Sequence, residues 1–313
     1  MSKTNIKKAS SANYDIIPRR VKFDWETSPL HWIPDDPFAS HALNEFSFLL
    51  TQGEKFFCRV FRTALPHVKD DKLRADVEAF IKQEAVHSHA HHESIEGYLK
   101  RLGLSGGRFE ERNALLFDQL LLDDPFGRKL PESLQYQWLV FRIGLVAAIE
   151  HYTAALGVFV LEADAWDKHG ADPIVADLFR WHGAEEVEHR TVAYDLYRHL
   201  GGTHSMRTLA MAIAFPALVS LSMLGTAHMI RHDEKLKNAS RTPIPLRLIL
   251  GWLRSARLGT FPAMRWFPLH ALRFLRPGYN PLDEASTEQA LAYIHSSPGV
   301  LAANNGVHHE KAE

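Results

Sequence analysis

Two E-x-x-H motifs supply the side chains of this chain that are best suited to bind a metal ion. Glu84 and His87 form the first motif, and Glu186 and His189 form the second. Residues three positions apart lie on one face of a helix, so each motif would place a carboxylate beside an imidazole. Carboxylate oxygen and imidazole nitrogen are both common metal ligands in proteins. The two motifs therefore predict metal binding by two helices.

A further glutamate precedes each motif on a separate segment. Glu54 lies thirty residues before Glu84, and Glu150 lies thirty-six residues before Glu186. Four helices with Glu, Glu-x-x-His, Glu and Glu-x-x-His facing inward describe the dinuclear carboxylate site of ferritin-like bundles. A single short motif in a histidine-rich chain can arise by accident. The ordered set on four segments instead favours a site for two metal ions.

Some of these assignments have competitors nearby in the chain. Glu45 competes with Glu54, which we prefer because it lies near the middle of its expected helix. Glu185 and Glu188 compete with Glu186, which alone completes an E-x-x-H motif with a histidine. One of the two competitors is a candidate for a hydrogen bond that orients a ligand histidine.

His91 and His182 are further histidines on the ligand faces and are the candidates for a catalytic role. His91 follows Glu84 by seven residues, and His182 precedes Glu186 by four. Helices two and four of a ferritin-like bundle are antiparallel, so both histidines should lie on the same side of the metals, about 5 Å along the axis. Two interpretations stay open: a hydrogen-bonded pair of core histidines, or extra ligation and proton delivery.

The ligands require four helices, and the turn residues of the chain indicate where these begin and end. We expect helices over 40–65, 70–102, 131–163 and 172–200. Ser40 is the expected N-cap of the first, and the pair Asp172–Pro173 is typical of a helix start. The glycine-containing segment 103–132 is interpreted as the long crossover between helices two and three.

The last third of the chain has a different composition. Residues 208–230 are 23 positions without Asp, Glu, Lys or Arg, long enough to span a bilayer core. Residues 231–276 carry ten Lys and Arg against two Asp and Glu, a net charge of +8, interleaved with aromatic residues. We therefore expect extra C-terminal helices after the bundle.

These observations predict an all-α protein with four parts. The parts are an N-terminal arm interrupted by prolines (1–38), a metal-binding four-helix bundle (39–202), an apolar and then basic and aromatic helical extension (203–280), and a polar C-terminal tail (281–313).

The segments TQGEKFF, FIKQEAVHSHAH, AAIEHYTA and WHGAEEVEH resemble those of the bacterial family called predicted metal-dependent hydrolases. That family is itself similar to the ferritin-like di-iron carboxylate superfamily. The resemblance covers most of residues 40–200 and implies a ferritin-like four-helix bundle. It implies a dinuclear site with the metal ligands Glu54, Glu84, His87, Glu150, Glu186 and His189.

Three functions are considered for such a site. The leading prediction is a dinuclear non-haem iron oxidase or oxygenase that acts on a lipophilic small molecule, with two iron ions, or manganese in their place, and dioxygen as cosubstrate. The alternative is a metal-dependent hydrolase that uses a metal-bridging hydroxide. The third function is iron binding or storage without turnover.

Composition excludes several other classes of protein. The chain has a net charge of −1, no glycine-rich phosphate loop, no nucleophile elbow and no nucleic-acid-binding motif, so we expect no nucleic-acid partner. The single Cys58 excludes an internal disulfide. The polar, basic N-terminus lacks the apolar core of a secretory signal, which predicts a cytoplasmic protein.

Residues 208–230 are not expected to cross a membrane as a lone span. A single crossing would export the +8 segment that follows, and positively charged flanks normally stay inside. We expect a helix buried against the bundle or against a second subunit in a homodimer. The alternative is peripheral contact of residues 208–276 with the inner face of the membrane.

Overall fold

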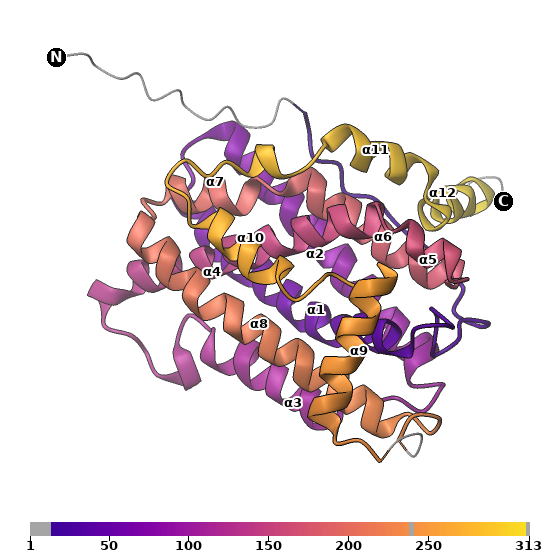
Figure 1. Ribbon diagram of the computed structural model, residues 1–313. Helices are drawn as coiled ribbons and strands as arrows, with labels where there is room; N and C mark the ends of the chain where they lie inside the picture. Colours follow the sequence, from indigo (N-terminus) through magenta and orange to yellow (C-terminus); the bar gives the residue numbers. More distant parts are fainter. Residues whose placement is uncertain (1–13, 238–240, 311–313) are drawn as a thin grey trace.

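The computed structural model describes residues 14–237 and 241–310, with side chains described as far as residue 305. These residues form helices joined by short connections, without a strand (Figure 1). The expectation of an all-α protein is confirmed. Residues 1–13 of the expected arm and 311–313 of the expected tail lie outside the described residues.

Four helices carry the candidate metal ligands. They are α1 (Pro37–Ala64), α2 (Asp71–Ser94), α4 (Glu132–Leu161) and α6 (Pro173–His189). α1 packs along α2, and α4 packs along α6. Stacked rings of Phe61 and Phe80, with centroids 4.3 Å apart, fill part of the space between α1 and α2.

α1 begins earlier than the sequence predicted. Its N-cap is Asp36, whose carboxylate accepts a hydrogen bond from the backbone of Ala39. Pro37 occupies the first turn, where a missing N–H costs no hydrogen bond. The expected cap Ser40 instead accepts a hydrogen bond from the backbone of Ile33. The last proline of the arm therefore starts the helix.

The fourth helix ends earlier than predicted. The expected cap Asp172 accepts hydrogen bonds from the backbone of Ile174 and Val175 at the start of α6. α6 ends at His189, and a separate helix α7 (Val192–His199) follows. The last candidate ligand is thus the final residue of its helix.

Two glycines allow α4 and α6 to approach closely. A Cβ atom added to Gly157 would lie only 2.2 Å from the carbonyl oxygen of Gly183. There is therefore no space for a side chain at Gly157. The crossing point lies seven residues after Glu150 and three before Glu186. Close packing here fixes the separation of the two helices that carry these ligands.

The expected crossover between helices two and three is itself largely helical. The predicted second helix ends in a π-helical turn (Ile95–Leu99) that continues α2. Within the crossover, α3 (Gly107–Leu115) packs against α1 and α8. A second π-helical turn (Leu116–Leu120) and a 3-10 turn (Pro125–Gly127) complete the connection.

The C-terminal helices cover two sides of the ligand helices. α8 (His204–His232), α9 (Ile244–Leu258) and α10 (Trp266–Phe274) lie at the front in Figure 1, with α8 packed against α1 and α4. α11 (Thr287–Ser296) and α12 (Pro298–Glu310) pack against α6 instead. Short helical segments complete the chain at Leu65–His67, Asp164–Lys168 (α5) and Pro281–Glu284.

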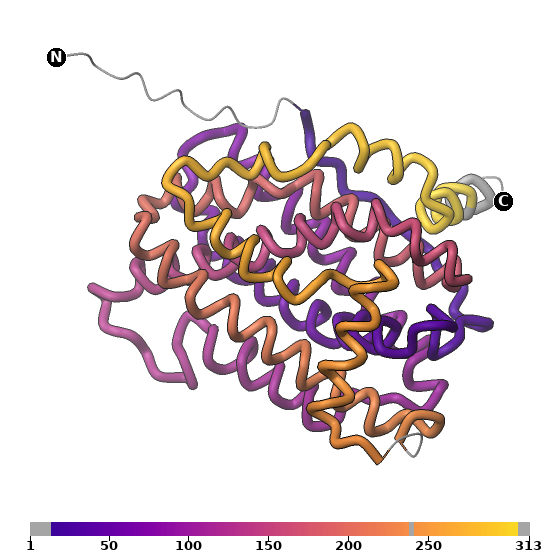
Figure 2. The backbone as a smooth tube through the Cα atoms, in the orientation of Figure 1, coloured from indigo at the N-terminus to yellow at the C-terminus, as the bar shows by residue number. Residues whose placement is uncertain are grey.

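The N-terminal arm and the C-terminal tail lie in contact with each other. Figure 2 shows the start of the described chain running beside the C-terminal helices, and the backbone of Lys22 donates a hydrogen bond to that of Gly299. Asp177 of α6 accepts hydrogen bonds from the Tyr293 hydroxyl and the Gly299 backbone. The segment 287–305 is therefore an ordered helical cover of α6 rather than a loose tail.

Among the described residues, two helices are long and apolar enough to cross a membrane by length and composition. In α4, 72% of the most apolar window is buried, as in the core helix of a globular protein. In α8, with a mean hydropathy of 1.9, only 22% of that window is buried. The expectation that this segment lies buried is therefore met on only one side of α8, because its opposite side has no partner among the described residues.

Candidate metal centre

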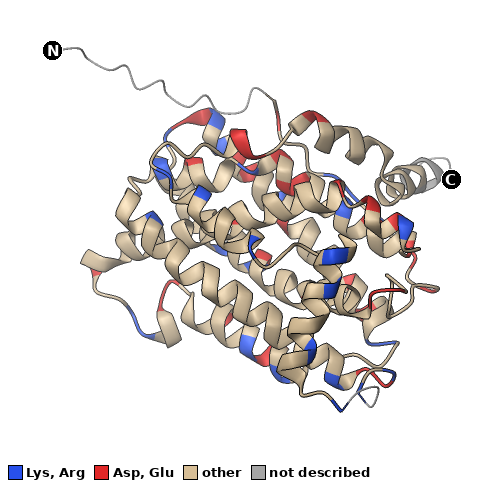
Figure 3. Ribbon diagram, viewed as in Figure 1, with Lys and Arg blue, Asp and Glu red and all other residues tan. Residues whose placement is uncertain are grey.

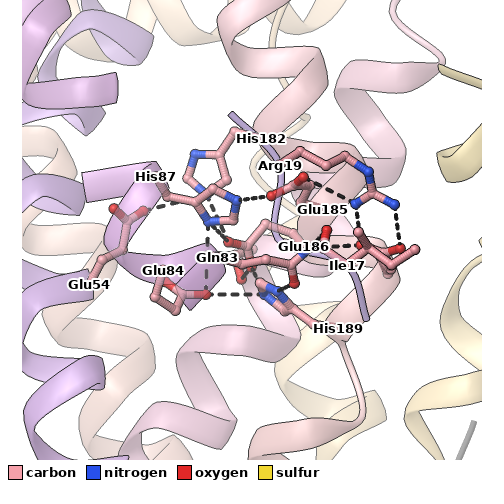
Figure 4. A network of polar contacts seen from close by, with 12 residues as sticks. Ile17, Arg19, Glu54, Gln83, Glu84, His87, His182, Glu185, Glu186 and His189 are labelled. Carbon is pink, nitrogen blue, oxygen red and sulfur yellow. Dashed lines mark hydrogen bonds and ion pairs between the residues drawn. The ribbon is translucent and has the colours of Figure 1, made fainter. Parts of the chain in front are cut away.

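The structure brings all six predicted ligands together in two adjoining groups. The first group comprises Glu54, His87, His182 and Glu186. The second comprises Glu84, Glu150, Glu186 and His189. Within each group the potential ligand atoms lie within 4.8 Å of one another, and every side chain is buried. Figure 4 shows most of these residues pointing toward a common centre.

Glu186 faces both groups with different oxygens. Its Oε1 lies 3.5 Å from His87 Nδ1 and 2.7 Å from His182 Nε2. Its Oε2 lies 3.4 Å from His189 Nε2. A carboxylate in this position can bridge two cations, one in each group.

Glu84 also lies between the two motif histidines. Its Oε1 is 3.2 Å from His189 Nε2 and 3.9 Å from His87 Nδ1 (Figure 4). Glu150 contributes from the far side, with Oε2 3.2 Å from His189 Nε2. Glu186 thus belongs to both groups, whereas Glu84 belongs to the second group and also lies near His87 of the first. Glu54 and Glu150 belong to one group each.

The outer nitrogen of each motif histidine has a hydrogen-bond partner that sets the ring orientation. His87 Nε2 lies 3.0 Å from Glu185 Oε2, which leaves Nδ1 facing the centre. His189 Nδ1 lies 3.0 Å from Gln83 Oε1, which leaves Nε2 facing the centre. Partners of this kind fix the tautomer of metal-binding histidines. Glu185 thus has the orienting role that was expected of either Glu185 or Glu188.

Behind these partners lies an arginine from the N-terminal arm. Arg19 donates two hydrogen bonds to Glu188, of 2.7 and 2.8 Å, and one of 3.2 Å to Glu185 (Figure 4). Gln83 Nε2 donates to Glu188 at 2.7 Å. Neither Arg19 nor Gln83 was predicted from the sequence. Gln83 directly precedes the first motif and could have been found by its helical position, whereas nothing local to Arg19 indicates its role.

His91 and His182 lie in direct contact, on the same side of the centre as expected. His91 Nε2 is 2.7 Å from His182 Nδ1. His182 Nε2 is also 3.4 Å from Glu54 Oε1, so His182 belongs to the first group, whereas His91 stands behind it. On its outer side, His91 Nδ1 lies 3.1 Å from the Ser47 hydroxyl. The two histidines therefore differ in their access to a metal, which the sequence did not indicate.

The buried donors of the centre fit bound cations. Many of their polar atoms are buried without a hydrogen-bond partner among the described residues, a costly arrangement for buried polar groups. These atoms are both carboxylate oxygens of Glu54, Glu84 and Glu150, Nδ1 of His87 and Nε2 of His189. A cation in each group would bind such atoms directly.

The raised pKa values of the buried carboxylates also indicate a site for bound cations. Burial, and then the charges of Glu186 and Glu150, raise the pKa of Glu54 and of Glu84 well above the ordinary value. Burial and Glu186 raise the pKa of Glu150 to about 7. Carboxylates this close repel one another in a medium of low dielectric constant. Positive charge at the centre would relieve that repulsion.

Glu45, the competitor of Glu54, belongs to neither group. It is buried beside Gly225 of α8, where a Cβ atom would lie 2.6 Å from Glu45 Oε2. Burial raises its pKa well above the ordinary value. The preference for Glu54 agrees with this placement.

A third cluster lies apart from the centre. His31 of the arm and His41 of α1 both approach Oδ2 of Asp233 through Nε2. Asp233 is the C-cap of α8. The three side chains therefore connect the arm, α1 and the end of α8.

An apolar cavity adjoins the first group. Its walls include Glu54 and Gly53 of α1, Thr153 of α4 and Phe215 of α8. A second cavity shares Thr153 with the first and reaches His182 and Glu186. The Thr153 hydroxyl donates a hydrogen bond to Glu186 Oε2. The centre is thus bordered by largely apolar space on the side of α1, α4 and α8.

A family model described as "Predicted metal-dependent hydrolase" matches residues 17–285. The chain belongs to this family. The predicted metal-dependent hydrolase match extends beyond the expected 40–200, and it takes in Arg19 as well as α8, α9 and α10. Neither the curated proteins nor the solved structures include a match to the chain. The family description agrees with the alternative function considered above, hydrolysis, and gives no support to the leading prediction of an oxidase or oxygenase.

Proposed function

We propose that this protein is a metal-dependent hydrolase that binds two cations between α1, α2, α4 and α6 and acts on an apolar small molecule. The observation that supports it best is the set of buried carboxylate and imidazole atoms without a hydrogen-bond partner, beside an apolar cavity. The family description adds support for hydrolysis. The ligand order Glu, E-x-x-H, Glu, E-x-x-H on these helices also supports a ferritin-like bundle, which we propose as the fold.

Each residue of the centre has a proposed part in binding. Glu84 and Glu186 would bridge the cations, and Glu54 and Glu150 would each hold one terminally. His87 and His189 would complete the two groups, with Glu185 and Gln83 holding their rings in place. When bound, the cations supply Lewis acidity that polarises the bond to be hydrolysed. Iron is the metal we expect, with manganese as the other choice for a carboxylate-rich site.

The pair His182–His91 is proposed to hold and move a proton. His182 reaches Glu186 through Nε2 and His91 through Nδ1, so a proton can pass between the centre and His91. Ser47, 3.1 Å from His91 Nδ1, extends this path away from the centre. These side chains thus offer a path along which a proton can move between the metal centre and water during hydrolysis.

The substrate is proposed to be lipophilic. The cavity beside Glu54 has an aliphatic and aromatic lining in which the polar side chains are few. An apolar substrate would exclude water there, and Thr153 and His182 would present polar atoms to its reactive end.

Oxidation is a second candidate, favoured by the donor set itself. Four carboxylates with two or three imidazoles, closed off from bulk water, suit iron redox chemistry as well as hydrolysis. Oxygen dependence separates the two. The apolar cavity would have no role in iron storage, the third function considered, so storage is not proposed.

The test is turnover of medium-chain acyl esters by protein loaded with iron or manganese, with and without dioxygen. We expect hydrolysis that is the same in both atmospheres and that is lost when a chelator removes the metal. Substrate consumption that requires oxygen, with matching oxygen uptake, would replace hydrolysis by oxidation. Mineral growth without turnover would indicate storage and contradict both enzyme assignments.

A further inference from the structure

The outward side of α8 carries an apolar stripe that no other element of the described chain covers. Leu209, Ile213 and Leu224 lie on this side and are between 45% and 54% exposed. The inward side packs against α1 and α4, with buried residues from Arg207 to Ala214 in the first half of the helix and from Gly225 to Ile230 at its end. α8 is thus held flat along the other helices, with its apolar outer side free.

α9 repeats this pattern. Leu246, Ile249, Leu250 and Leu253 recur at three- and four-residue spacing, hence on one face, and each is about half exposed. The opposite side of the helix buries Trp252. An amphipathic helix whose apolar side faces outward is the reverse of the arrangement in a water-soluble surface helix.

α10 adds Leu269 and Leu272, of which Leu272 is 63% exposed. α10 packs against α8, and α9 also packs against α8. All three helices lie at the front of the molecule in Figure 1. We call the exposed leucine and isoleucine side chains of these helices the α8–α10 face. An apolar area contributed by three neighbouring helices usually marks a binding surface.

Arginines stand at the ends of the three stripes. Arg231 follows Leu224 by seven residues, Arg257 follows Leu253 by four, and Arg265 precedes Leu269 by four, so each extends its stripe. All three are exposed, and none forms an ion pair with a carboxylate in the described ranges 14–237 and 241–310.

Negative charge is nearly absent from this part of the chain. Residues 204–276 contain only Asp233, which is buried, and Glu234 as acidic residues. Figure 3 shows α8 uncharged between its ends and basic residues along α9. Cationic side chains around an apolar patch complement the anionic headgroups and acyl chains of a bilayer.

We propose that the α8–α10 face docks on the surface of a bilayer that contains anionic lipids. The leucines enter the boundary between headgroups and acyl chains, and the arginines meet lipid phosphates. α8 lies in the plane of the membrane rather than across it, because its inward side remains packed on α1 and α4.

Docking would also place the apolar cavity next to the lipid. Phe215 and Val219 of α8, Trp252 of α9 and Phe267 of α10 line that cavity from the inside. The same three helices would then separate the bilayer from the metal centre. This consequence rests on the proposed function, whereas docking itself does not.

The experiment measures co-sedimentation of the metal-loaded full chain with vesicles, in the absence of substrate. We expect binding to vesicles of phosphatidylcholine with phosphatidylglycerol, and weaker binding to phosphatidylcholine alone or at high salt. Leu250→Glu and Leu272→Glu should each lower the partition coefficient by at least about tenfold. Both positions are exposed, so folding should be kept, and circular dichroism checks it.

Matched variants test whether the α8–α10 face is the surface that binds the vesicles. Leu301→Glu, at an exposed leucine of α12, should leave vesicle binding unchanged. Arg257→Glu and Arg265→Glu should weaken binding, whereas Lys168→Glu on α5 should not. Because no turnover is measured, the result does not depend on which reaction the centre catalyses.

Three results would overturn the proposal. The first is that unmodified protein binds neither type of vesicle. The second is that Leu250→Glu leaves vesicle binding intact while converting a dimer to a monomer in sedimentation velocity, which would assign the face to a second copy of the chain. The third is resistance of cellular protein to extraction by high salt and alkaline carbonate, which would indicate a membrane-spanning α8.

Discussion

At the scale of single residues, Glu186 has the most consequential position. It is the only residue shared by the two candidate metal groups. Its two oxygens face different histidines, so removing the carboxylate would affect both groups at once. By contrast, Glu54 or Glu150 each belongs to one group alone.

We therefore predict that Glu186→Ala reduces bound metal from two ions toward one or none and abolishes turnover. The reason is that each of the two groups loses a carboxylate oxygen that could bind a cation. Metal content by elemental analysis and activity of the reloaded protein are the measurements. Glu78→Ala, at an exposed site of α2, is the control. Two tightly bound metals and full activity in Glu186→Ala would show that the ligands are assigned incorrectly.

At the scale of elements, the α4–α6 crossing positions half of the centre. Gly157 and Gly183 meet backbone to backbone, and a methyl group at either has no space. Gly53 of α1 differs, because a Cβ atom there would make an ordinary contact of 3.6 Å with the ring of Phe117. The close approach of the helices therefore requires glycine at 157 and 183, whereas packing does not require it at 53.

Gly157→Ala should lower the free energy of unfolding by about 1–3 kcal/mol, since the helices must separate to admit the methyl group. It should also weaken metal binding, because Glu150 and Glu186 move apart. Gly53→Ala should be neutral or stabilising by up to about 1 kcal/mol through its better helix propensity. Urea denaturation of both variants provides the comparison. Equal stability of the two would mean that the crossing tolerates wider spacing than the structure shows.

At the scale of the whole molecule, the arm closes the centre from outside. Arg19 neutralises Glu188 and Glu185, which in turn hold Gln83 and His87. The side chain of Arg19 is only 13% exposed, so these charges interact in a poorly hydrated environment. The arm therefore stabilises the ligand geometry without contacting the centre.

Arg19→Ala would leave two buried carboxylates without their cation, and we expect it to lower the free energy of unfolding by about 3–5 kcal/mol. Metal affinity should fall by about 10- to 100-fold, as for the loss of other partners that orient ligand histidines. The exposed neighbour Arg20→Ala is the matched control. Denaturation and chelator competition measure the two effects. Unchanged metal affinity in Arg19→Ala would show that the arm stabilises the fold but does not affect metal binding.

Helical spacing in the sequence predicted the all-α class and the six side chains that the structure brings into two adjoining groups. Glu84 with His87, and Glu186 with His189, must share helix faces because three residues make nearly one turn. The helix start at Asp172 was also predicted from the sequence, because an N-cap side chain bonds to the backbone of the first turn of its own helix. Predictions of this kind succeed because the interactions involved lie within a few residues of one another.

Only the tertiary structure decided which side chains surround that set. Arg19 and Glu188 are separated by 169 positions in the chain, so no local pattern relates them. Helical register placed His91 and His182 on one side of the centre, but it did not specify their direct contact. The inclusion of His182 in the first group depends on the distance between helices, as does the packing of 287–305 on α6. The outward exposure of α9 likewise depends on what covers each helix. Such contacts arise from packing between distant segments, which helical periodicity does not specify.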